Sequence, residues 1–513
     1  MLEKIDLKKK ANWSDYDERI DKLEIRIGEL QREAKELGIP VMILFEGYEA
    51  SGKGTMINRM IRALDPRGFQ VFPTEKVTED EEMHPYLWRF FTKTPAKGRI
   101  HIFDKSWYQG YFSEDLTPED IRQFEKQFTD DGNLIVKFFL AITEKEQKKR
   151  LKSLEKNKST KWRVSDDDWD QNKRFREKEQ AYDNLLIKTD TPNCPWTIVE
   201  AMDRKYAAMK ILSTLAKSLE EAVAATKAKA AARESAKKAV AEKQGEISNS
   251  AVSMAVGDND GSSADKKSAG INEDFKNGVL AGIDLSKSLD DDEYRRKKKD
   301  LQKRLAILHN KMYLKRVPVV LAFEGWDAGG KGGAIKRITQ AIDPRGYEVV
   351  PTASPNDIEK AHHYLWRFWE RFPKDGHMAI FDRTWYGRVM VERIEGFATE
   401  EEWKRAYAEI NNMEAQLVKN GTVVLKFWMH IDKDEQAARF KSRQETPEKQ
   451  WKITDEDWRN REKWDEYEKA VDEMIVRTST EKAPWHVIEA NDKRYARIKV
   501  LEIVVEALEN ALR

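Results

Sequence analysis

The 513-residue sequence predicts an α/β protein with two tandem domains, each built on a five-stranded parallel sheet between helices. Three observations predict this fold class. A long stretch of the sequence occurs twice, apolar runs alternate with charged helical stretches in both copies, and a glycine-rich loop follows the first apolar run of each copy.

The repeat defines the domain organisation. Residues 5–7 (Ile-Asp-Leu) return at 283–285, an offset of 278, and residues 86–90 (Tyr-Leu-Trp-Arg-Phe) return at 364–368. Further along the chain the offset becomes 289, so that Pro195-Trp196 match Pro484-Trp485. A repeat of this length is too long for a solenoid. It predicts two homologous domains, residues 1–220 and 283–513.

The segment between the copies, residues 221–282, has a different composition. Residues 221–240 are rich in Ala and Lys, which favour helix. Residues 245–270 are rich in Ser, Gly, Asp and Asn, with almost no large apolar side chain. We therefore expect a helical extension followed by a flexible tether.

Each copy contains five short apolar runs separated by charge-rich helical stretches. Continuous apolar strands that alternate with helices predict a parallel sheet covered on both faces. The predicted strands are 41–45, 69–72, 100–103, 134–140 and 197–199 in the first copy, and 319–323, 347–350, 378–381, 423–428 and 486–488 in the second.

Composition excludes several classes of protein. Lys plus Arg total 92 and Asp plus Glu total 91, and this balance excludes a globally basic nucleic-acid coat. The single cysteine, Cys194, excludes a disulfide within the chain and argues against a cysteine-based metal site. No signal core and no apolar run near the ~18 residues of a membrane span are present. We expect a cytoplasmic protein with no membrane partner and, without a recognised nucleic-acid module, no nucleic-acid partner.

The glycine-rich loop of the second copy follows the predicted strand 319–323. Residues 324–332 read Glu-Gly-Trp-Asp-Ala-Gly-Gly-Lys-Gly and contain the pattern G-x-x-x-x-G-K. Glycines let successive backbone N–H groups face an anion, the following helix adds its positive dipole, and Lys331 adds a full charge. The loop therefore predicts phosphate binding by Gly325, Gly329, Gly330, Lys331 and Gly332.

Two residues depart from the general phosphate-loop pattern. Gly332 stands where Ser or Thr usually holds Mg²⁺, and Asp327 lies inside the loop. Asp327 is predicted to contact a metal ion or to accept a proton near the transferred phosphoryl group. Capping of the loop backbone is the alternative role for this side chain.

A second acidic residue, Asp382, ends the predicted strand 378–381. An aspartate in this place is the usual second Mg²⁺ anchor of P-loop enzymes, and carboxylate oxygens suit that ion. We predict Asp382 and Asp327 as metal ligands, for Mg²⁺ or alternatively Mn²⁺. Arg383 and Arg388 follow and are predicted to neutralise phosphate oxygens, with surface ion pairs as the alternative.

Further cations gather on two predicted helices. Arg439 and Arg443 are four residues apart and share a helix face, and Lys452 follows in a turn marked by proline. In kinases of nucleoside phosphates this place is a mobile lid that aims arginines at developing charge. A solvated helix face is the alternative. Lys336 and Arg337, on the helix after the phosphate loop, are further predicted phosphate contacts.

Together with residues 363–369 (His-Tyr-Leu-Trp-Arg-Phe-Trp) and 381–388 (Phe-Asp-Arg-Thr-Trp-Tyr-Gly-Arg), these motifs resemble the polyphosphate kinase 2 family. The resemblance covers 283–509 and, in a degraded form, 1–215. It implies P-loop kinase domains similar to thymidylate kinase with a helical lid. It also implies Mg²⁺-dependent phosphoryl transfer between inorganic polyphosphate and a nucleotide. Tandem-domain members mainly phosphorylate AMP to ADP. Members acting on nucleoside diphosphates tend to carry Asn at the position of Asp382, which points the same way.

By resemblance, the functional positions of the second copy are Asp327, Lys331, Asp382, Arg383, Arg388 and Arg443. The first copy keeps Lys53 but has Glu49 for Asp327, Lys105 for Arg383 and Leu154 for Arg443. Because the transition state needs its charge compensated, we expect the first copy to be catalytically weak or dead. It would then serve as a partner in an internal pseudo-dimer, with a further homo-oligomer left open.

Two rival functions share these motifs. An ATP-dependent nucleoside monophosphate kinase has the same loop and lid, but would be saturated by ATP and not by polyphosphate. A non-catalytic scaffold that binds nucleotides or polyanions through both copies is the other.

Overall fold

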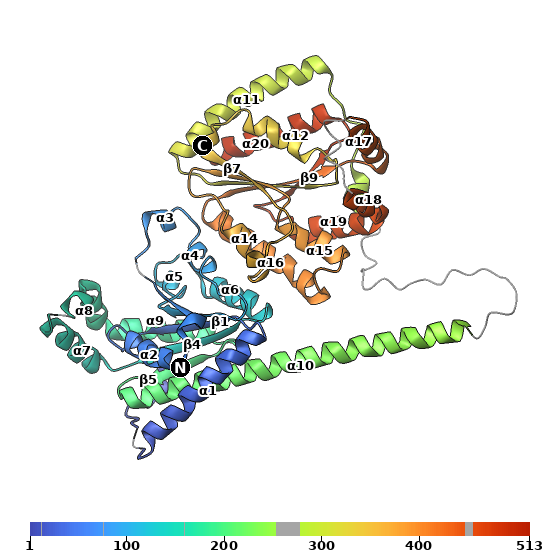
Figure 1. The fold of residues 1–513 in the computed structure, drawn as a ribbon. Coiled ribbons are helices and arrows are strands. Elements are labelled where there is room, and N and C mark those ends of the chain that lie inside the picture. Colours follow the sequence, from blue (N-terminus) through green and yellow to red (C-terminus); the bar gives the residue numbers. More distant parts are fainter. Residues whose placement is uncertain (12, 75, 159, 253–277, 447–454) are drawn as a thin grey trace. The chain divides into compact units, whose positions relative to one another are not determined.

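The computed structural model describes residues 1–513 except 12, 75, 159, 253–277 and 447–454 (Figure 1). The chain forms two compact units, one of residues 1–76 and 93–271 and the other of residues 77–92 and 272–513. The short segment 77–92 of the first repeat thus belongs to the second unit. There the Trp88 indole N–H donates to the Trp369 carbonyl over 2.9 Å.

The first unit holds a five-stranded parallel sheet in the order β2-β3-β1-β4-β5. Its strands are β1 (Val41–Gly47), β2 (Phe69–Pro73), β3 (Ile100–Asp104), β4 (Leu134–Ala141) and β5 (Trp196–Glu200). Its helices are α1 (Tyr16–Glu36), α2 (Lys53–Met60), α5 (Gln109–Phe112), α6 (Pro118–Asp130), α7 (Glu144–Lys156), α8 (Asp166–Lys173), α9 (Phe175–Thr189) and α10 (Arg204–Val252).

The second unit repeats this topology in the order β7-β8-β6-β9-β10. Its strands are β6 (Val319–Gly325), β7 (Tyr347–Pro351), β8 (Met378–Asp382), β9 (Val423–His430) and β10 (Trp485–Glu489). Its longer helices are α11 (Asp291–Leu314), α12 (Lys331–Thr339), α16 (Glu400–Lys419), α17 (Lys433–Glu445), α18 (Asp455–Glu462), α19 (Trp464–Thr478) and α20 (Lys493–Ala511). Its short helices are α3 (Glu79–Glu82), α4 (Trp88–Phe91), α13 (Asp357–Lys360), α14 (Trp366–Trp369) and α15 (Val391–Ile394).

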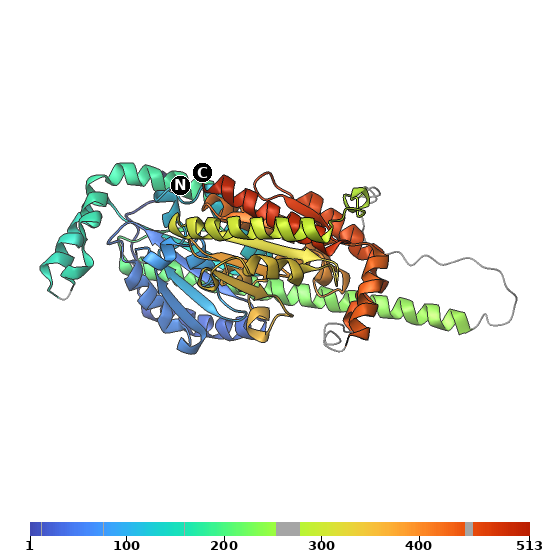
Figure 2. The same ribbon diagram turned by 90° about the horizontal axis from the view of Figure 1, so that it is seen from above.

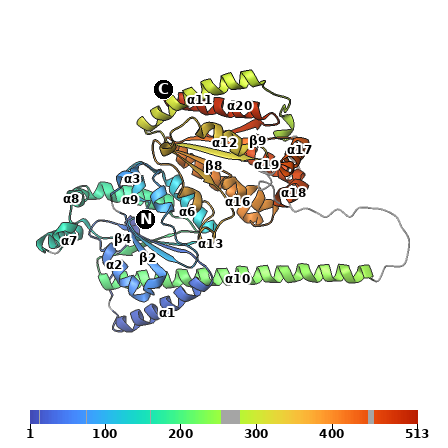
Figure 3. The same ribbon diagram turned by 45° about the horizontal axis from the view of Figure 1, so that its top comes forward.

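All ten predicted strands and the predicted fold class are confirmed. The central strands β1 and β6 are buried almost throughout because helices cover both sheet faces. In the second unit α11, α12 and α20 lie on one face and α14 and α16 on the other (Figures 1 and 3). The strands β6 and β8 are parallel neighbours. The loops that follow them therefore leave the same edge of the sheet.

A buried ion pair occupies the same place in both cores. Lys426 is fully buried, and its ammonium donates to Glu414 (2.7 Å), to the Tyr386 hydroxyl (2.9 Å) and to the Thr478 carbonyl (2.6 Å). Lys137 makes the matching three bonds in the first unit, to Glu125, Tyr108 and Thr189. Every member is hydrogen-bonded, which is what a buried charge requires.

The linker helix is longer than expected. α10 is continuous from Arg204 to Val252 and extends well past the sheet of its unit (Figure 2). The predicted helix at 221–240 is confirmed, whereas residues 245–252, expected within the tether, are helical. Residues 253–277 lie outside the described part. Among the described residues, no helix combines the length and the apolar character needed to cross a membrane.

Candidate active site

The glycine-rich loop of the second unit joins β6 to α12. Gly325 has φ of +146°, and a Cβ there would lie 2.6 Å from the Met429 Cβ and carbonyl oxygen, so only glycine lets the loop cross β9. The Lys331 ammonium lies over this loop and donates to the carbonyls of Gly325 (2.6 Å) and Trp326 (3.4 Å). The lysine and the N-terminus of α12 therefore converge on the loop, as phosphate binding requires.

Trp326 anchors the loop to the protein core. Its ring stacks on Trp464 with centroids 3.6 Å apart and an interplanar angle of 9°, and its indole N–H donates to His430 Nδ1 over 3.1 Å. Burial lowers the pKa of His430 to about 4, which keeps the ring neutral and able to accept this bond. The loop conformation is thus fixed by apolar stacking.

Asp327 points away from its own loop backbone toward two neighbouring segments. Its carboxylate accepts a hydrogen bond from Arg383 (3.3 Å) and one from Asn460 of α18 (3.0 Å). Its carbonyl accepts from Gln436 of α17 (3.1 Å). These contacts connect the loop to α17 and α18, while the metal or proton-transfer role of Asp327 stays a prediction.

Asp382 lies at the carboxyl end of β8, where it pairs in register with Phe323 of β6. Its counterpart in the first unit, Asp104, has Oδ2 3.9 Å from the place of a Cβ on Gly54, so that carboxylate faces the first turn of α2. Within the described residues no group of three or more His, Cys, Asp and Glu forms a ready-made metal site. Carboxylate oxygens at this edge suit Mg²⁺, which usually takes its other ligands from phosphate and water.

Glu324 at the end of β6 is a residue that the sequence reasoning did not single out. Its Oε1 accepts hydrogen bonds from the Thr384 N–H (2.7 Å) and hydroxyl (2.9 Å), which fixes the loop carrying Arg383. Burial raises the pKa of Glu324 to about 6, although Lys331 nearby opposes the rise. The sequence did contain a signal for this residue, because both copies have a glutamate, Glu46 and Glu324, near the end of the first strand.

The predicted arginines fall into different surroundings. Arg383 has a left-handed backbone, with φ of 65°, and its half-exposed guanidinium reaches Asp327. Arg388 instead lies 4.3 Å over the Tyr364 ring and pairs with Glu392 at 3.1 Å. Arg383 therefore joins the loop, whereas a phosphate contact by Arg388 stays a prediction.

Arg439 acts as a clamp within the protein. Its guanidinium donates to Glu435 (2.5 Å), to the loop carbonyl of Ala328 (2.8 Å) and to the carbonyls of Ala490 (2.6 Å) and Asn491 (2.9 Å). It thereby ties the phosphate loop to the segment before α20. Arg150 makes the equivalent bonds in the first unit, so both units share this clamp. A contact of Arg439 with phosphate stays a prediction.

A pocket of about 290 Å³ opens beside the loop between α12, α17 and α20. We call it the cationic pocket because four of its lining side chains are basic and none is acidic or aromatic. Its lining residues are Ala328, Gly329, Gly330, Gly333, Met429, Arg439, Ser442, Arg443, Lys493, Ala496 and Arg497.

Two of these cations, Lys493 and Arg497 on α20, were not predicted as site residues. A Cβ on Gly333 would lie 3.4 Å from Arg497 Nη2 and 3.5 Å from its Nε, so Gly333 leaves the room for this guanidinium. The first copy has Thr55 and Ala208 at these two positions. The paired replacement was visible in the repeat alignment, but only the fold shows that the two residues meet.

The remaining predicted contacts lie at the margin. Lys336 is exposed on α12. Arg337 donates to the Gly333 carbonyl over 3.2 Å, on the same helix. Lys452 lies outside the described residues. A Cβ on Gly332 would meet no heavy atom within 4 Å, so the missing Ser or Thr is not explained by crowding.

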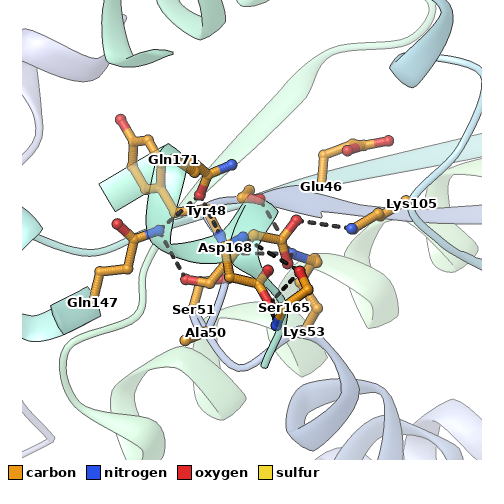
Figure 4. Close-up of polar contacts among 12 residues, drawn as sticks. Glu46, Tyr48, Ala50, Ser51, Lys53, Lys105, Gln147, Ser165, Asp168 and Gln171 are labelled. Carbon is orange, nitrogen blue, oxygen red and sulfur yellow. Dashed lines mark hydrogen bonds and ion pairs between the residues drawn. The ribbon is translucent and has the colours of Figure 1, made fainter. Parts of the chain in front are cut away.

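The first unit has the same loop, but a carboxylate of the loop pairs with the lysines beside it (Figure 4). Lys53 is buried and bonded to the carbonyls of Gly47 and Tyr48, both at 3.2 Å. Glu49 pairs with Lys105 at 2.8 Å and with Lys53 at 3.6 Å. Burial raises the pKa of Glu49, but the two lysines outweigh it, so the pKa lies below its usual value and the charge persists. Glu49 therefore pairs with both lysines and compensates part of their charge.

The chain was compared with known proteins. A sequence profile described as polyphosphate kinase 2 (PPK2) matches residues 9–227 and 288–513. A protein of Pseudomonas aeruginosa named polyphosphate:AMP phosphotransferase is 39% identical, over 100% of this chain and 99% of its own length. One of the same name from Pseudomonas syringae pv. tomato is 38% identical, over 92% and 90%. The crystal structure of a polyphosphate kinase 2 from Pseudomonas aeruginosa superimposes with a TM-score of 0.83 and 36% identity, over 100% of this chain and 99% of the other.

Proposed function

The chain belongs to the polyphosphate kinase 2 family, and from that premise we propose that it transfers the terminal phosphoryl group of inorganic polyphosphate to AMP, giving ADP. The reverse reaction uses the same site. The acceptor is taken from the relatives that match the full length of the chain, which are named for AMP.

The observation that carries the proposal is the cationic pocket beside the phosphate loop. The loop and Lys331 suit the terminal phosphoryl group, and we assign Arg443, Lys493 and Arg497, which line the pocket, to further phosphates of the donor. A polyanion needs this charge along its length, because each phosphate carries a charge to be compensated.

The chain's own residues have distinct parts in the reaction. Lys331 and the loop amides hold the terminal phosphoryl group, and Arg383 lies beside Asp327, where charge develops during transfer. Asn460 and Arg383 orient the Asp327 carboxylate, while Trp326 and Arg439 keep the loop rigid. Asp382 and Asp327 would hold Mg²⁺, which supplies charge neutralisation between donor and acceptor phosphates. Catalysis is then mainly positioning and electrostatics.

The lining of the pocket argues against ATP as the donor. A nucleoside donor calls for an apolar or aromatic surface for its base. The described lining of the cationic pocket has no aromatic ring, and Met429, Ala328 and Ala496 are its apolar side chains. Polyphosphate is therefore the better donor on chemical grounds.

A product assay tests the proposal. The protein is incubated with Mg²⁺, polyphosphate and either AMP, ADP or GMP, without ATP, and the nucleotides are separated. ADP should form from AMP, and Lys331→Ala should remove this product. Product only when ATP replaces polyphosphate would support the monophosphate kinase instead, and no product with any acceptor would support a scaffold.

The role of Asp327 has its own test. Asp327→Asn keeps the size of the side chain and its bond from Asn460, so polyphosphate binding should change little. Turnover should fall by about 10²-fold or more, because the carboxylate charge is lost at the reacting centre. Unchanged turnover would refute a catalytic Asp327.

Three further expectations accompany the proposal. We expect the protein to act in the cytoplasm, to need no nucleic-acid partner, and to use its two copies as an internal pseudo-dimer. Size measurement in solution would decide whether a further homo-oligomer forms.

A further inference from the structure

Helix α7 of the first unit carries a continuous row of lysines on its exposed face. Lys145, Lys148, Lys149, Lys152 and Lys156 line an open depression of about 450 Å³ together with Ser153. Lys145, Lys148, Lys152 and Lys156 follow one another at three or four residues, and Lys149 lies four after Lys145 and three before Lys152, so the five share one face of the helix. We call these five residues the lysine stripe.

The charge of the stripe is largely uncompensated. Lys149 lies 3.3 Å from Glu146, which is itself shared with Arg150. Over the described part of the chain the other four lysines have no ion pair, and all five side chains are exposed. Like charges this close repel one another, so the stripe is costly to the isolated helix.

The equivalent helix of the second unit, α17, shows that this pattern is not required by the fold. At the stripe positions it has Asp434, Ala437, Ala438, Lys441 and Glu445. The two helices otherwise share their framework, including the clamp arginines Arg150 and Arg439. The two copies therefore differ on both sides of this helix: the first has Leu154 in place of the pocket-lining Arg443, and it has four more lysines at the stripe positions.

We propose that the lysine stripe is a second binding surface for inorganic polyphosphate, separate from the phosphate loop of either copy. A row of flexible ammonium groups suits a polymer of repeating phosphates that needs no fixed geometry. The stripe has no aromatic ring on which a nucleobase stacks, which favours polyphosphate over single-stranded nucleic acid. The identity of this polyanion rests on the proposed function. The stripe would hold long chains that the second copy consumes.

The experiment measures equilibrium binding on the full-length chain without a nucleotide acceptor, so that no phosphoryl transfer occurs. The stripe variant combines Lys145→Gln, Lys148→Gln, Lys152→Gln and Lys156→Gln. Glutamine preserves helix propensity, and Lys149 with its Glu146 pair is left intact. A control variant removes the same charge from α10 through Lys217→Gln, Lys227→Gln, Lys229→Gln and Arg233→Gln.

The stripe variant should bind long-chain polyphosphate about tenfold more weakly than the parent, and its affinity should depend less steeply on salt. Affinity for tripolyphosphate, which is too short to occupy both surfaces, should not change, and the control variant should match the parent. Equal loss in both variants would overturn the proposal, because net charge alone would then explain it.

Two other outcomes are informative. If an RNA oligonucleotide binds the parent more tightly than polyphosphate and loses this affinity in the stripe variant, the surface is a nucleic-acid site and the proposal is wrong. Wild-type protein that makes no ADP from polyphosphate and AMP would contradict the proposed function. Loss of long-chain binding in the stripe variant but not in the control variant would still support the lysine stripe as a polyphosphate-binding surface.

Discussion

Gly333 and Arg497 lie against each other in the second copy, and the first copy has neither residue. The missing side chain of Gly333 lets the Arg497 guanidinium lie against the first turn of α12, at the edge of the cationic pocket. In the first copy, Thr55 has a side chain where Gly333 has none, and Ala208 has no charge where Arg497 has its guanidinium.

Copying the first unit's residue into the second tests this pair. Gly333→Thr should displace Arg497 and raise the KM for polyphosphate about tenfold or more, since a charge-assisted contact contributes about 1.5–3 kcal/mol. Steady-state kinetics with varied polyphosphate measure the change. Thr55→Gly in the first copy is the matched control and should leave KM as it is. An unaltered KM in folded Gly333→Thr would remove Arg497 from donor binding.

Glu324 should make stability depend on pH. Its pKa is raised from 4.5 to about 6 by burial, so the folded state holds a proton that the unfolded state releases. The stability that this group contributes is therefore present at low pH and lost as pH rises through about 6. Glu324→Gln removes this dependence. The stability of the variant relative to wild type should rise by about 2 kcal/mol between pH 4 and pH 7, at about 1.4 kcal/mol per pKa unit.

Denaturant unfolding at a series of pH values measures that difference. A relative stability that stays flat across this range would show that Glu324 ionises at its ordinary pKa. A constant offset from an altered bond to Thr384 does not affect the result, because only the change with pH is interpreted.

At the scale of elements, the buried lysine of β9 joins four segments. Lys426 connects its strand to α16 through Glu414, to the segment after β8 through Tyr386, and to the end of α19 through Thr478. The same bonds occur in the first unit, where the positions of Arg383 and Arg443 hold Lys105 and Leu154. This pattern indicates a role in holding the fold rather than in the reaction.

Breaking this pair should destabilise the second unit strongly. Lys426→Met leaves Glu414 charged and buried, and should lower the free energy of unfolding by about 3–5 kcal/mol. The double variant Lys426→Met/Glu414→Leu should recover much of this loss. Urea unfolding measures both. Lys404→Met removes an exposed ion pair with Glu400 and, as a control, should change stability by less than about 1 kcal/mol. A mild effect of Lys426→Met alone would contradict the structural role.

The strands were predictable because parallel strands buried on both faces are continuously apolar. Such runs can be recognised from a few consecutive residues. The end of α10 was not, because Ser and Asn near residue 248 lower helix propensity without excluding helix. The bonds of Arg439 were not predictable either. Its spacing with Arg443 gives a shared face, and both line the pocket, but only the fold shows that the Arg439 guanidinium also donates to the carbonyls of Ala328 and Ala490.

At the scale of the whole molecule, the two phosphate loops should differ in their importance. Lys331→Ala should lower kcat by about 10²–10³-fold, because it removes the ammonium that stabilises the negative phosphoryl group in the transition state. Lys53→Ala should leave kcat within about twofold, because Glu49 already pairs with that lysine and the first copy has Leu154 and Ala208 in place of Arg443 and Arg497. Turnover measured at saturating polyphosphate and AMP compares them. Loss of activity in Lys53→Ala with retention in Lys331→Ala would reverse the assignment of the active copy.

The duplicated fold also has a genetic consequence. In an assembly of identical subunits, one codon change alters every phosphate loop at once, so a loop cannot be lost without losing catalysis everywhere. Here the two loops are encoded separately, and Glu49 and Leu154 affect one of them while Asp327 and Arg443 remain in the other. A change in the loop or surface of the first copy therefore leaves the phosphate loop of the second copy unaltered.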